Sequence, residues 1–196
     1  MALLRSINRT DTPPLIEGEG VYLRRPMAQD FEQWAALRAS SRDFLTPWEP
    51  TWPLDDLTRT AYRRRMRRYA KDMRDDAAYP LFIFRSGDDT LLGGCTLSNV
   101  RRGVTQSCSL GYWIGEPFKR RGLMSEAVKA VIPYAFYDLR LNRVEAACLP
   151  TNEASQRLLR RVGFVEEGYA RKYLRINGIW QDHVLFAIVK GDPIPA

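Results

Sequence analysis

The sequence predicts one domain of the mixed α/β (α+β) class, built on a central and mostly antiparallel sheet. The chain has 196 residues, of which 45% are hydrophobic, which is enough to enclose one full core. Runs with strand-like alternation follow one another across short polar turns, a pattern that favours antiparallel pairing. Four segments with helical apolar spacing lie between or beside these runs. We therefore expect about seven strands, with four or so helices flanking the sheet.

The chain begins with a stretch that shows no periodic pattern. Residues 1–20 hold a Pro-Pro pair and a Gly-Glu-Gly turn, so we expect a flexible N-terminal arm there. The single domain is expected to span residues 21–190, and residues 191–196 form a C-terminal tail. Residues 21–26 alternate like a strand, and residues 30–40 carry apolar side chains at helical spacing behind an acidic cap.

The stretch "FLTPWEPTWP", residues 44–53, combines three prolines with two tryptophans. Proline opposes regular structure, whereas exposed tryptophan is unfavourable in an ordinary surface loop. We expect an irregular loop that forms one wall of a substrate site. A helix over residues 56–75 follows, with an apolar stripe and many cations outside it: Arg63, Arg64, Arg65, Arg67, Arg68 and Lys71. These cations form either a solvated face or a surface for an anionic partner such as ribosomal RNA.

The second half of the chain alternates strands and helices. Three strand-like runs over residues 79–84, 90–100 and 107–114 predict an antiparallel meander. A helix over 123–136 should kink or end its first regular part at Pro133. The remaining elements are a buried strand at 143–149, a helix at 152–162 capped by Asn152 and stopped by Gly163, and a hairpin of residues 164–176 and 179–189 around Asn177-Gly178.

Composition limits the partners without selecting one. The formal net charge of +7 favours an acidic partner, which could be a polynucleotide, a ribosome or an anionic cofactor. No apolar run approaches the ~20 residues that span a bilayer, and the N-terminus lacks the pattern of a signal peptide, so we expect a cytoplasmic protein without membrane contact. Cys95, Cys108 and Cys148 show no metal-type spacing and are expected to be buried free thiols.

The run Lys119-Arg120-Arg121-Gly122 lies directly before a helix-like segment. A nucleic-acid surface would spread its cations among aromatic residues, whereas these cations are compact and stop where the helix begins. A helix N-terminus offers unpaired N–H groups, and glycine lets a phosphate approach the backbone. The spacing matches neither a Walker loop nor a dinucleotide fingerprint. We therefore expect a cradle for a pyrophosphate.

Several motifs together resemble the GNAT superfamily of acetyl-CoA-dependent N-acetyltransferases. The segment Lys119–Met124 is similar to its pyrophosphate loop, although Lys119 and Met124 depart from the pattern at its two ends. Asn152-Glu153-Ala154-Ser155 with Gly163-Phe164 resembles its second cofactor helix. Within the superfamily, the RimJ type of ribosomal-protein alanine N-acetyltransferase is similar in three stretches, "FLTPWEP", "LSNVRRG…LGYWIGEPFKRRGLMSEA" and "LLRRVGFVEEGYARKYLRINGIWQDHV". The resemblance covers residues 21–190.

The resemblance implies a GNAT-like fold, acetyl-CoA as cosubstrate, and no metal. The strand "LGYWI", the fourth of the shared fold, would splay from the fifth, "RVEAACL", so that pantetheine fills the gap. The cofactor contacts that it implies are Tyr112, Trp113, Ile114, Lys119, Arg120, Arg121, Gly122, Leu123, Met124, Ser125, Asn152 and Ser155. Many members carry a tyrosine that acts as the general acid at the position where this chain has Leu159. We expect Ser155 to replace that tyrosine as the proton donor to the thiolate.

The base that deprotonates the amine is less evident. Glu49, in the Trp-Pro loop, is our candidate, acting directly or through water. His183, the single histidine, has a suitable ordinary pKa near ~6.5, but its alternating strand position favours a structural role. Asp182 could pair with a backbone group or hold the substrate ammonium.

The resemblance implies direct attack, in a ternary complex, by the N-terminal alanine of a small-subunit ribosomal protein. An α-amine with pKa ~7.8 is roughly one-tenth neutral at pH 7, far more than a lysine, which suits a site without a strong base. Acetylation of a polyamine or aminoglycoside is the alternative within enzymes. A non-catalytic CoA- or RNA-binding module associated with ribosomes is the alternative outside them. Monomer and dimer both remain open.

Overall fold

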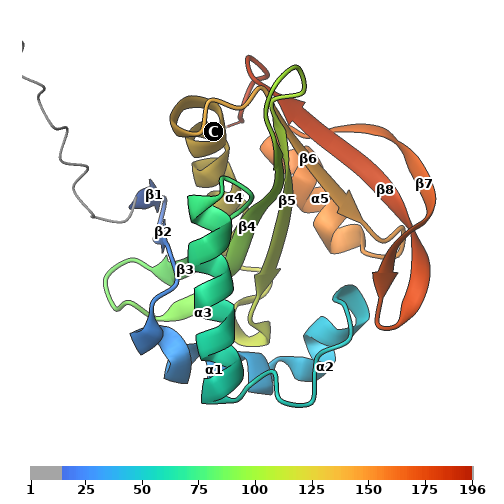
Figure 1. Ribbon diagram of the computed structural model, residues 1–196. Helices are drawn as coiled ribbons and strands as arrows, with labels where there is room; N and C mark the ends of the chain where they lie inside the picture. Colours follow the sequence, from blue (N-terminus) through green and yellow to red (C-terminus); the bar gives the residue numbers. More distant parts are fainter. Residues whose placement is uncertain (1–14, 196) are drawn as a thin grey trace, which may run out of the picture.

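The computed structural model describes residues 15–195, which form one eight-stranded sheet with helices on both faces (Figure 1). The strand order is β1-β2-β3-β4-β5-β6-β8-β7. The strands are β1 (Ile16–Gly18), β2 (Val21–Arg24), β3 (Tyr79–Arg85), β4 (Leu91–Arg101), β5 (Ser107–Ile114), β6 (Arg143–Cys148), β7 (Val165–Ile176) and β8 (Ile179–Val189). The helices are α1 (Phe31–Ser40), α2 (Arg42–Leu45), α3 (Arg59–Arg74), α4 (Leu123–Pro133) and α5 (Glu153–Val162).

The predicted class is confirmed, since every strand pair is antiparallel except β5 with β6. The sheet has one strand more than the seven expected. Strand β1 lies inside the stretch assigned to a flexible arm, and it pairs with β2 from Ile16 to Gly18. The ordered domain therefore begins before Val21, and residues 1–14 of the predicted arm lie outside the described residues. At the other end, Ile194 of the predicted tail packs against the core.

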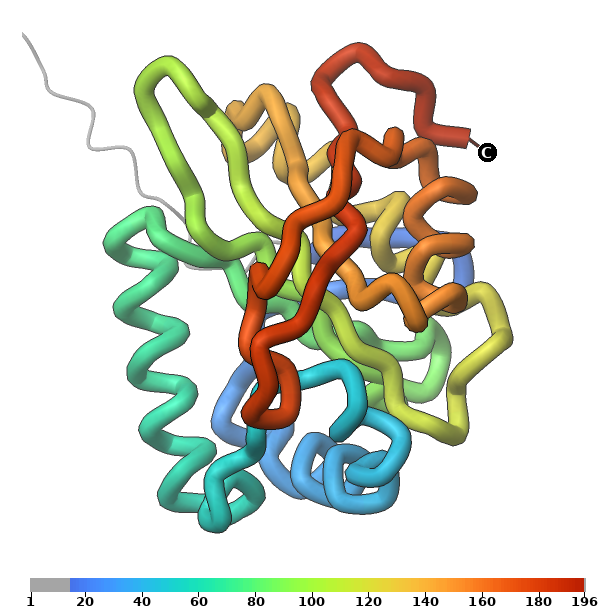
Figure 2. Tube along the Cα trace, turned by 90° about the vertical axis from the view of Figure 1, so that its right-hand side faces the viewer, coloured from blue at the N-terminus to red at the C-terminus, as the bar shows by residue number. Residues whose placement is uncertain are grey.

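Two apolar layers enclose the sheet. Helices α4 and α5 cover one face, where residues such as Val131 and Leu159 pack on Val144 and Phe186. Helices α1 and α3 cover part of the other face, where Trp34 and Tyr62 pack on residues of β3. Figure 2 shows the β7–β8 hairpin crossing the molecule towards the loop after α2. These layers hold the hairpin strands β7 and β8, and the N-terminal ends of α4 and α5, in fixed positions around the centre of the sheet.

Local chemistry accounts for most element ends. The Asn152 side chain caps α5 by accepting from the Ser155 N–H at 3.1 Å, and Gly163 ends that helix at φ 101°. Pro133 ends α4, and a π-helical turn over Tyr134–Asp138 follows. Asn177 and Gly178 both have positive φ, as a two-residue turn between β7 and β8 requires.

Two local predictions were wrong. The helix expected from residue 56 begins at Arg59, because Thr58 caps it and Asp56 instead binds Arg65 at 2.6 Å. The Trp-Pro segment was expected to lack regular structure, but it contains the end of α2 and a 3-10 turn over Thr46–Trp48. Proline is tolerated there because the first N–H groups of a helical turn have no intrahelical acceptor.

Strands β5 and β6 pair over only a short stretch. Their parallel register joins residues 107–109 to residues 143–145. Beyond Ser109, β5 pairs only with β4, and beyond Glu145, β6 pairs only with β8. The expected splay between the two strands is therefore present, and it leaves backbone groups of both strands free along a gap in the middle of the sheet.

Candidate active site

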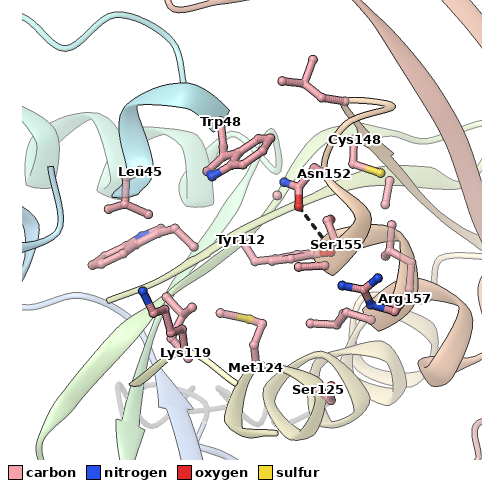
Figure 3. A pocket seen from close by; sticks show the side chains of 18 of the residues that line it. Leu45, Trp48, Tyr112, Lys119, Met124, Ser125, Cys148, Asn152, Ser155 and Arg157 are labelled. Atoms are coloured by element: carbon pink, nitrogen blue, oxygen red, sulfur yellow. Dashed lines mark hydrogen bonds between the residues drawn. The ribbon is translucent and has the colours of Figure 1, made fainter. Parts of the chain in front are cut away.

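A cavity of about 660 Å³ occupies the gap between β5 and β6. Its walls come from both splayed strands, the N-terminal ends of α4 and α5, the segment after α1, and the β7–β8 hairpin. Figure 3 shows the side chains of Leu45 and Trp48 on one side of this space and those of Met124 and Lys119 on another. Segments distant in the chain thus meet at one hollow, and most of the predicted site residues line it.

The cavity passes through the sheet. Tyr112 packs with the core beneath α4 and α5, whereas its neighbour Trp113 packs with the cluster beneath α1 and α3. Adjacent strand residues point to opposite faces, and both of these residues line the cavity. We call the α4–α5 face the cofactor side and the other face the acceptor side. Glu49 and His183 also line the cavity.

The N-terminus of α4 forms an anion cradle on the cofactor side. Gly122 is the N-cap residue, with φ 78°, and a Cβ at this position would meet no protein atom within 4 Å. Its carbonyl accepts from the N–H groups of Ser125 and Glu126. The N–H groups of Leu123 and Met124 have no intrahelical acceptor, so they can bind a phosphate together with the positive end of the helix dipole.

The three cations of the loop differ in their surroundings. Lys119 binds Glu116 at 2.7 Å, so part of its charge is neutralised. Arg120 and Arg121 are exposed and have no ion pair among the described residues. The loop is fixed to the acceptor side by a hydrogen bond of 2.9 Å from the Glu116 N–H to the fully buried Ser41 hydroxyl.

Two hydroxyl groups meet on the cofactor side. The Tyr112 and Ser155 oxygens lie 2.7 Å apart, and either can donate. Burial raises the pKa of Tyr112 above its ordinary value, so the phenol stays protonated and can supply a proton to Ser155. Leu159 is buried in the core, and its side chain has no group that could donate a proton. In Figure 3 the side chains of Asn152 and Ser155 face each other across the first turn of α5.

The Glu49 carboxylate is held on the acceptor side by an arginine and a tryptophan. The Arg38 Nη1 and Nη2 atoms donate to its two oxygens, each at 2.7 Å, and Trp52 Nε1 donates to Oε2 at 2.7 Å. The Arg38 guanidinium also lies over the rings of Trp52 and Trp113, at 3.9 and 4.9 Å from their centroids. Because three donors occupy the carboxylate, the predicted role of Glu49 as a base is not favoured, and we assign it to positioning.

The residues that the sequence left open also have defined surroundings. Asp182 accepts from the Lys172 N–H at 2.7 Å and from the Tyr169 hydroxyl at 2.8 Å, so it bonds within the hairpin. His183 is almost fully buried and contacts the Gln181 carbonyl through Nδ1 at 3.0 Å. Groups of three or more His, Cys, Asp or Glu side chains placed to hold a metal ion are absent from residues 15–195.

Residues 21–165 match the family model of the acetyltransferase (GNAT) domain. The chain belongs to the GNAT acetyltransferase family. It is 35% identical over 178 residues to the probable N-acetyltransferase YjcK of Bacillus subtilis (strain 168), covering 91% of this chain and 98% of that protein. It is 35% identical over 171 residues to the [ribosomal protein uS5]-alanine N-acetyltransferase of Escherichia coli (strain K12), which covers 86% of this chain and 88% of that protein. The structure of Mycobacterium smegmatis RimJ in complex with CoA-disulfide superposes with a TM-score of 0.83 at 29% identity, and the match covers 91% of this chain and 87% of that one.

GNAT acetyltransferases take their acetyl group from acetyl-CoA, and the residues of this acetyltransferase fit that donor. The free N–H groups at Leu123 and Met124 suit a pyrophosphate, and the unpaired edges of β5 and β6 suit the amides of pantetheine. The structure brings these elements together with Asn152 and Ser155, as expected from the sequence.

Sequence reasoning missed three features of the site. The Tyr112 side chain, considered only for its backbone, contacts Ser155. Cys148, considered only as a buried thiol, lines the cavity. Arg38 was not considered, although its position four residues after Trp34 places it on the buried stripe of α1. A charged residue on an apolar stripe is a signal of a buried ion pair that could have been detected.

Proposed function

We propose that this GNAT acetyltransferase acetylates the N-terminal α-amine of a ribosomal protein, and that the acceptor is the terminal alanine of a small-subunit protein. The supporting observation is the 35% identity, across nearly the full length of both chains, to the enzyme named for alanine of ribosomal protein uS5. The cavity that crosses the sheet supports direct transfer, because a donor on one face and an acceptor on the other would meet within it.

The residues divide the chemistry between the two sides of the sheet. The amine nitrogen attacks the thioester carbonyl carbon; a C–N bond forms, the C–S bond breaks, and the nitrogen loses one proton. Backbone N–H groups of the unpaired β5 edge would stabilise the developing oxyanion. Ser155, supported by the Tyr112 hydroxyl, donates a proton to the departing thiolate, and solvent restores the proton to this pair.

The charge of the cavity favours a peptide terminus over a polyamine. Glu49 is the single acidic residue in the cavity lining, and its carboxylate is bound by Arg38. A polyamine with several ammonium groups would lack counter-charges there. An α-amine is more easily deprotonated than a lysine, so it makes smaller demands on the site.

Acetyl transfer to synthetic peptides tests the proposal directly. The peptides would begin with alanine, serine or methionine, and one would be blocked at its N-terminus but carry an internal lysine. We expect mass spectrometry to find a single acetyl group on the α-amine of the alanine peptide, formed faster than on the others. Acetylation of spermidine in preference to all of the peptides would contradict the proposal. Ribosome binding without any turnover would support the non-catalytic alternative.

A second proposal concerns the exposed face of α3, which we expect to contact ribosomal RNA. Arg63, Arg67 and Arg68 are exposed and form no ion pairs among the described residues, whereas Arg64 pairs with Asp55 and Lys71 with Asp75. Free cations along one helix suit a phosphate backbone. Such a partner implies the cytoplasm. No helix in the described part of the chain is long and apolar enough to cross a membrane.

Sedimentation with ribosomes tests this surface. The Arg63→Glu/Arg67→Glu variant should pellet less with ribosomes, and added salt should weaken pelleting of the wild type. The control is Lys71→Glu/Arg74→Glu, which makes the same change in net charge elsewhere on α3 and should reduce pelleting less. Equal loss in both variants would indicate a diffuse charge effect. Gel filtration with light scattering would determine whether the protein is a monomer or a dimer.

A further inference from the structure

The acceptor side needs a group that takes the proton from the amine, and the cavity lining offers few candidates. Its cationic residues cannot serve, and Tyr112, Cys148 and Ser155 lie on the cofactor side or bind one another. Glu49 and His183 are the two remaining side chains in the lining that can accept a proton near neutral pH. The inference below rests on the proposed transfer to an α-amine.

The surroundings of Glu49 oppose a role as proton acceptor. Both of its oxygens accept from the Arg38 guanidinium at 2.7 Å, and Oε2 also accepts from Trp52. Three donors thus already occupy the carboxylate, so an incoming amine would have to displace one of them or use the remaining lone pair. The backbone carbonyl of Glu49 is occupied as well, by the Asn177 N–H at 2.9 Å.

His183 has one ring nitrogen bound and the other free. Its Nδ1 lies 3.0 Å from the carbonyl oxygen of Gln181. A carbonyl only accepts, so Nδ1 carries the hydrogen of the neutral ring and Nε2 carries the lone pair. The Tyr173 ring and the imidazole form a T-shaped pair with centroids 5.8 Å apart, and this contact further limits rotation of the imidazole.

The lone pair of Nε2 is open to the cavity. Within residues 15–195, Arg38 Nε is the one fully enclosed side-chain nitrogen or oxygen that lacks a hydrogen-bond partner. Nε2 has no protein partner either, so it is not fully enclosed, and the cavity is the hollow that His183 lines. The next residue, Val184, points into the main core, which places the His183 side chain on the opposite face of β8, the acceptor side.

We infer that Nε2 of His183 is the proton acceptor for the attacking amine. At pH 7 most of the α-amine is an ammonium; its extra proton moves to Nε2, the freed lone pair forms the C–N bond, and the imidazolium releases its proton to solvent through the cavity. The nitrogen loses its second proton to solvent as the C–S bond breaks. Burial lowers the pKa of His183, which keeps the ring neutral at pH 7. The charged groups nearby are already bonded: Glu49 to Arg38, and Asp182 to the Lys172 N–H and the Tyr169 hydroxyl.

Two substitutions separate a chemical role from a structural one. His183→Asn retains a donor near the position of Nδ1, so the bond to the Gln181 carbonyl can persist while Nε2 is lost. His183→Ala leaves a space that free imidazole can enter from the cavity. We expect kcat/KM for the alanine peptide to fall about 100-fold at pH 7 in both variants, with acetyl-CoA affinity retained.

Chemical rescue and pH dependence complete the test. Imidazole should restore turnover to His183→Ala, and pyrazole, which has the same shape but is far less basic, should not. The wild-type rate should fall as the pH drops through the pKa of the ring, which burial holds below its ordinary value of ~6.5. The deficit of His183→Asn should shrink towards pH 9, where the amine arrives neutral. Equal rescue by both azoles, or a deficit that is constant with pH, would show a packing role and overturn the inference. Absence of turnover by the wild type would instead refute the proposed function.

Discussion

The hydroxyl groups of Tyr112 and Ser155 share a hydrogen bond of 2.7 Å although 43 positions separate the two residues in the chain. One belongs to the splayed strand β5 and the other to the first turn of α5. The bond therefore links β5 to α5 on the cofactor side of the cavity, where β5 and β6 are not paired. It also gives Ser155 a phenolic partner.

Removal of either hydroxyl should slow turnover more than it weakens CoA binding. We expect Tyr112→Phe and Ser155→Ala each to lower kcat by about 10-fold or more, with the dissociation constant of CoA changed less. The double variant should be little slower than the worse single one, because the two hydroxyls act as a unit. Steady-state kinetics and calorimetry measure both quantities. Equal losses in kcat and CoA affinity would reassign the pair to binding.

A side chain at Gly122 should weaken CoA binding. Gly122→Val places a branched Cβ in the open space over the anion cradle and in a backbone conformation with positive φ. Gly103→Val is the matched control, because Gly103 also has positive φ and open surroundings but lies outside the cavity. Both variants should lose about 1 kcal/mol of unfolding free energy. Calorimetry should show weaker CoA binding for Gly122→Val alone; unchanged binding would refute the cradle.

Loss of the Arg38 guanidinium should destabilise the fold and impair the acceptor site. Arg38→Met leaves the Glu49 carboxylate, only 19% exposed, without its counter-charge, which should cost about 3 kcal/mol in urea unfolding. KM for the peptide should rise more than KM for acetyl-CoA. Adding Glu49→Gln should recover part of the stability. The control Lys71→Met removes an exposed ion pair and should leave the midpoint of urea unfolding nearly unchanged. If Lys71→Met and Arg38→Met lowered the midpoint equally, the positioning role of Arg38 would be contradicted.

Cys148 should be the thiol that CoA protects from alkylation. It lines the cavity, whereas Cys95 and Cys108 lie wholly within the core. Burial raises the pKa of Cys148, so iodoacetamide should react slowly at pH 7 and faster as pH rises beyond the ordinary value of ~8.5. Mass spectrometry should place the label on this residue, with CoA suppressing it. Similar labelling of all three thiols, with or without CoA, would place Cys148 outside the binding site.

Periodicity and turn chemistry were sufficient to predict most elements from the sequence. The hairpin around Asn177-Gly178 follows from residues that tolerate positive φ, and the end of α4 follows from Pro133. Strand β1 was missed because three residues are too short for a recognisable alternation; its pairing with β2 comes from tertiary structure.

The site was predictable where a local motif carries the chemistry. Gly122 and Asn152 act through helix ends, which adjacent residues determine. The partners of Tyr112, Arg38 and His183 lie on other elements or depend on the orientation of a ring, so no local spacing reveals them. The ion pair of Glu49 was not evident for the same reason, since the buried arginine that binds it lies on helix α1.

The hydrogen bond from the Asn177 N–H to the Glu49 carbonyl joins the Trp-Pro loop to the tip of the β7–β8 hairpin. In Figure 2 these two segments meet at the lower part of the molecule, below the centre of the sheet. The backbone thereby forms a bridge beside the cavity, which Glu49 and Ile176 both line. A polypeptide can pass beneath such a bridge by its end, whereas the middle of a chain could enter only if this hydrogen bond opened. The enzyme would thus select chain termini by topology, before any side chain recognises the residue that is acetylated.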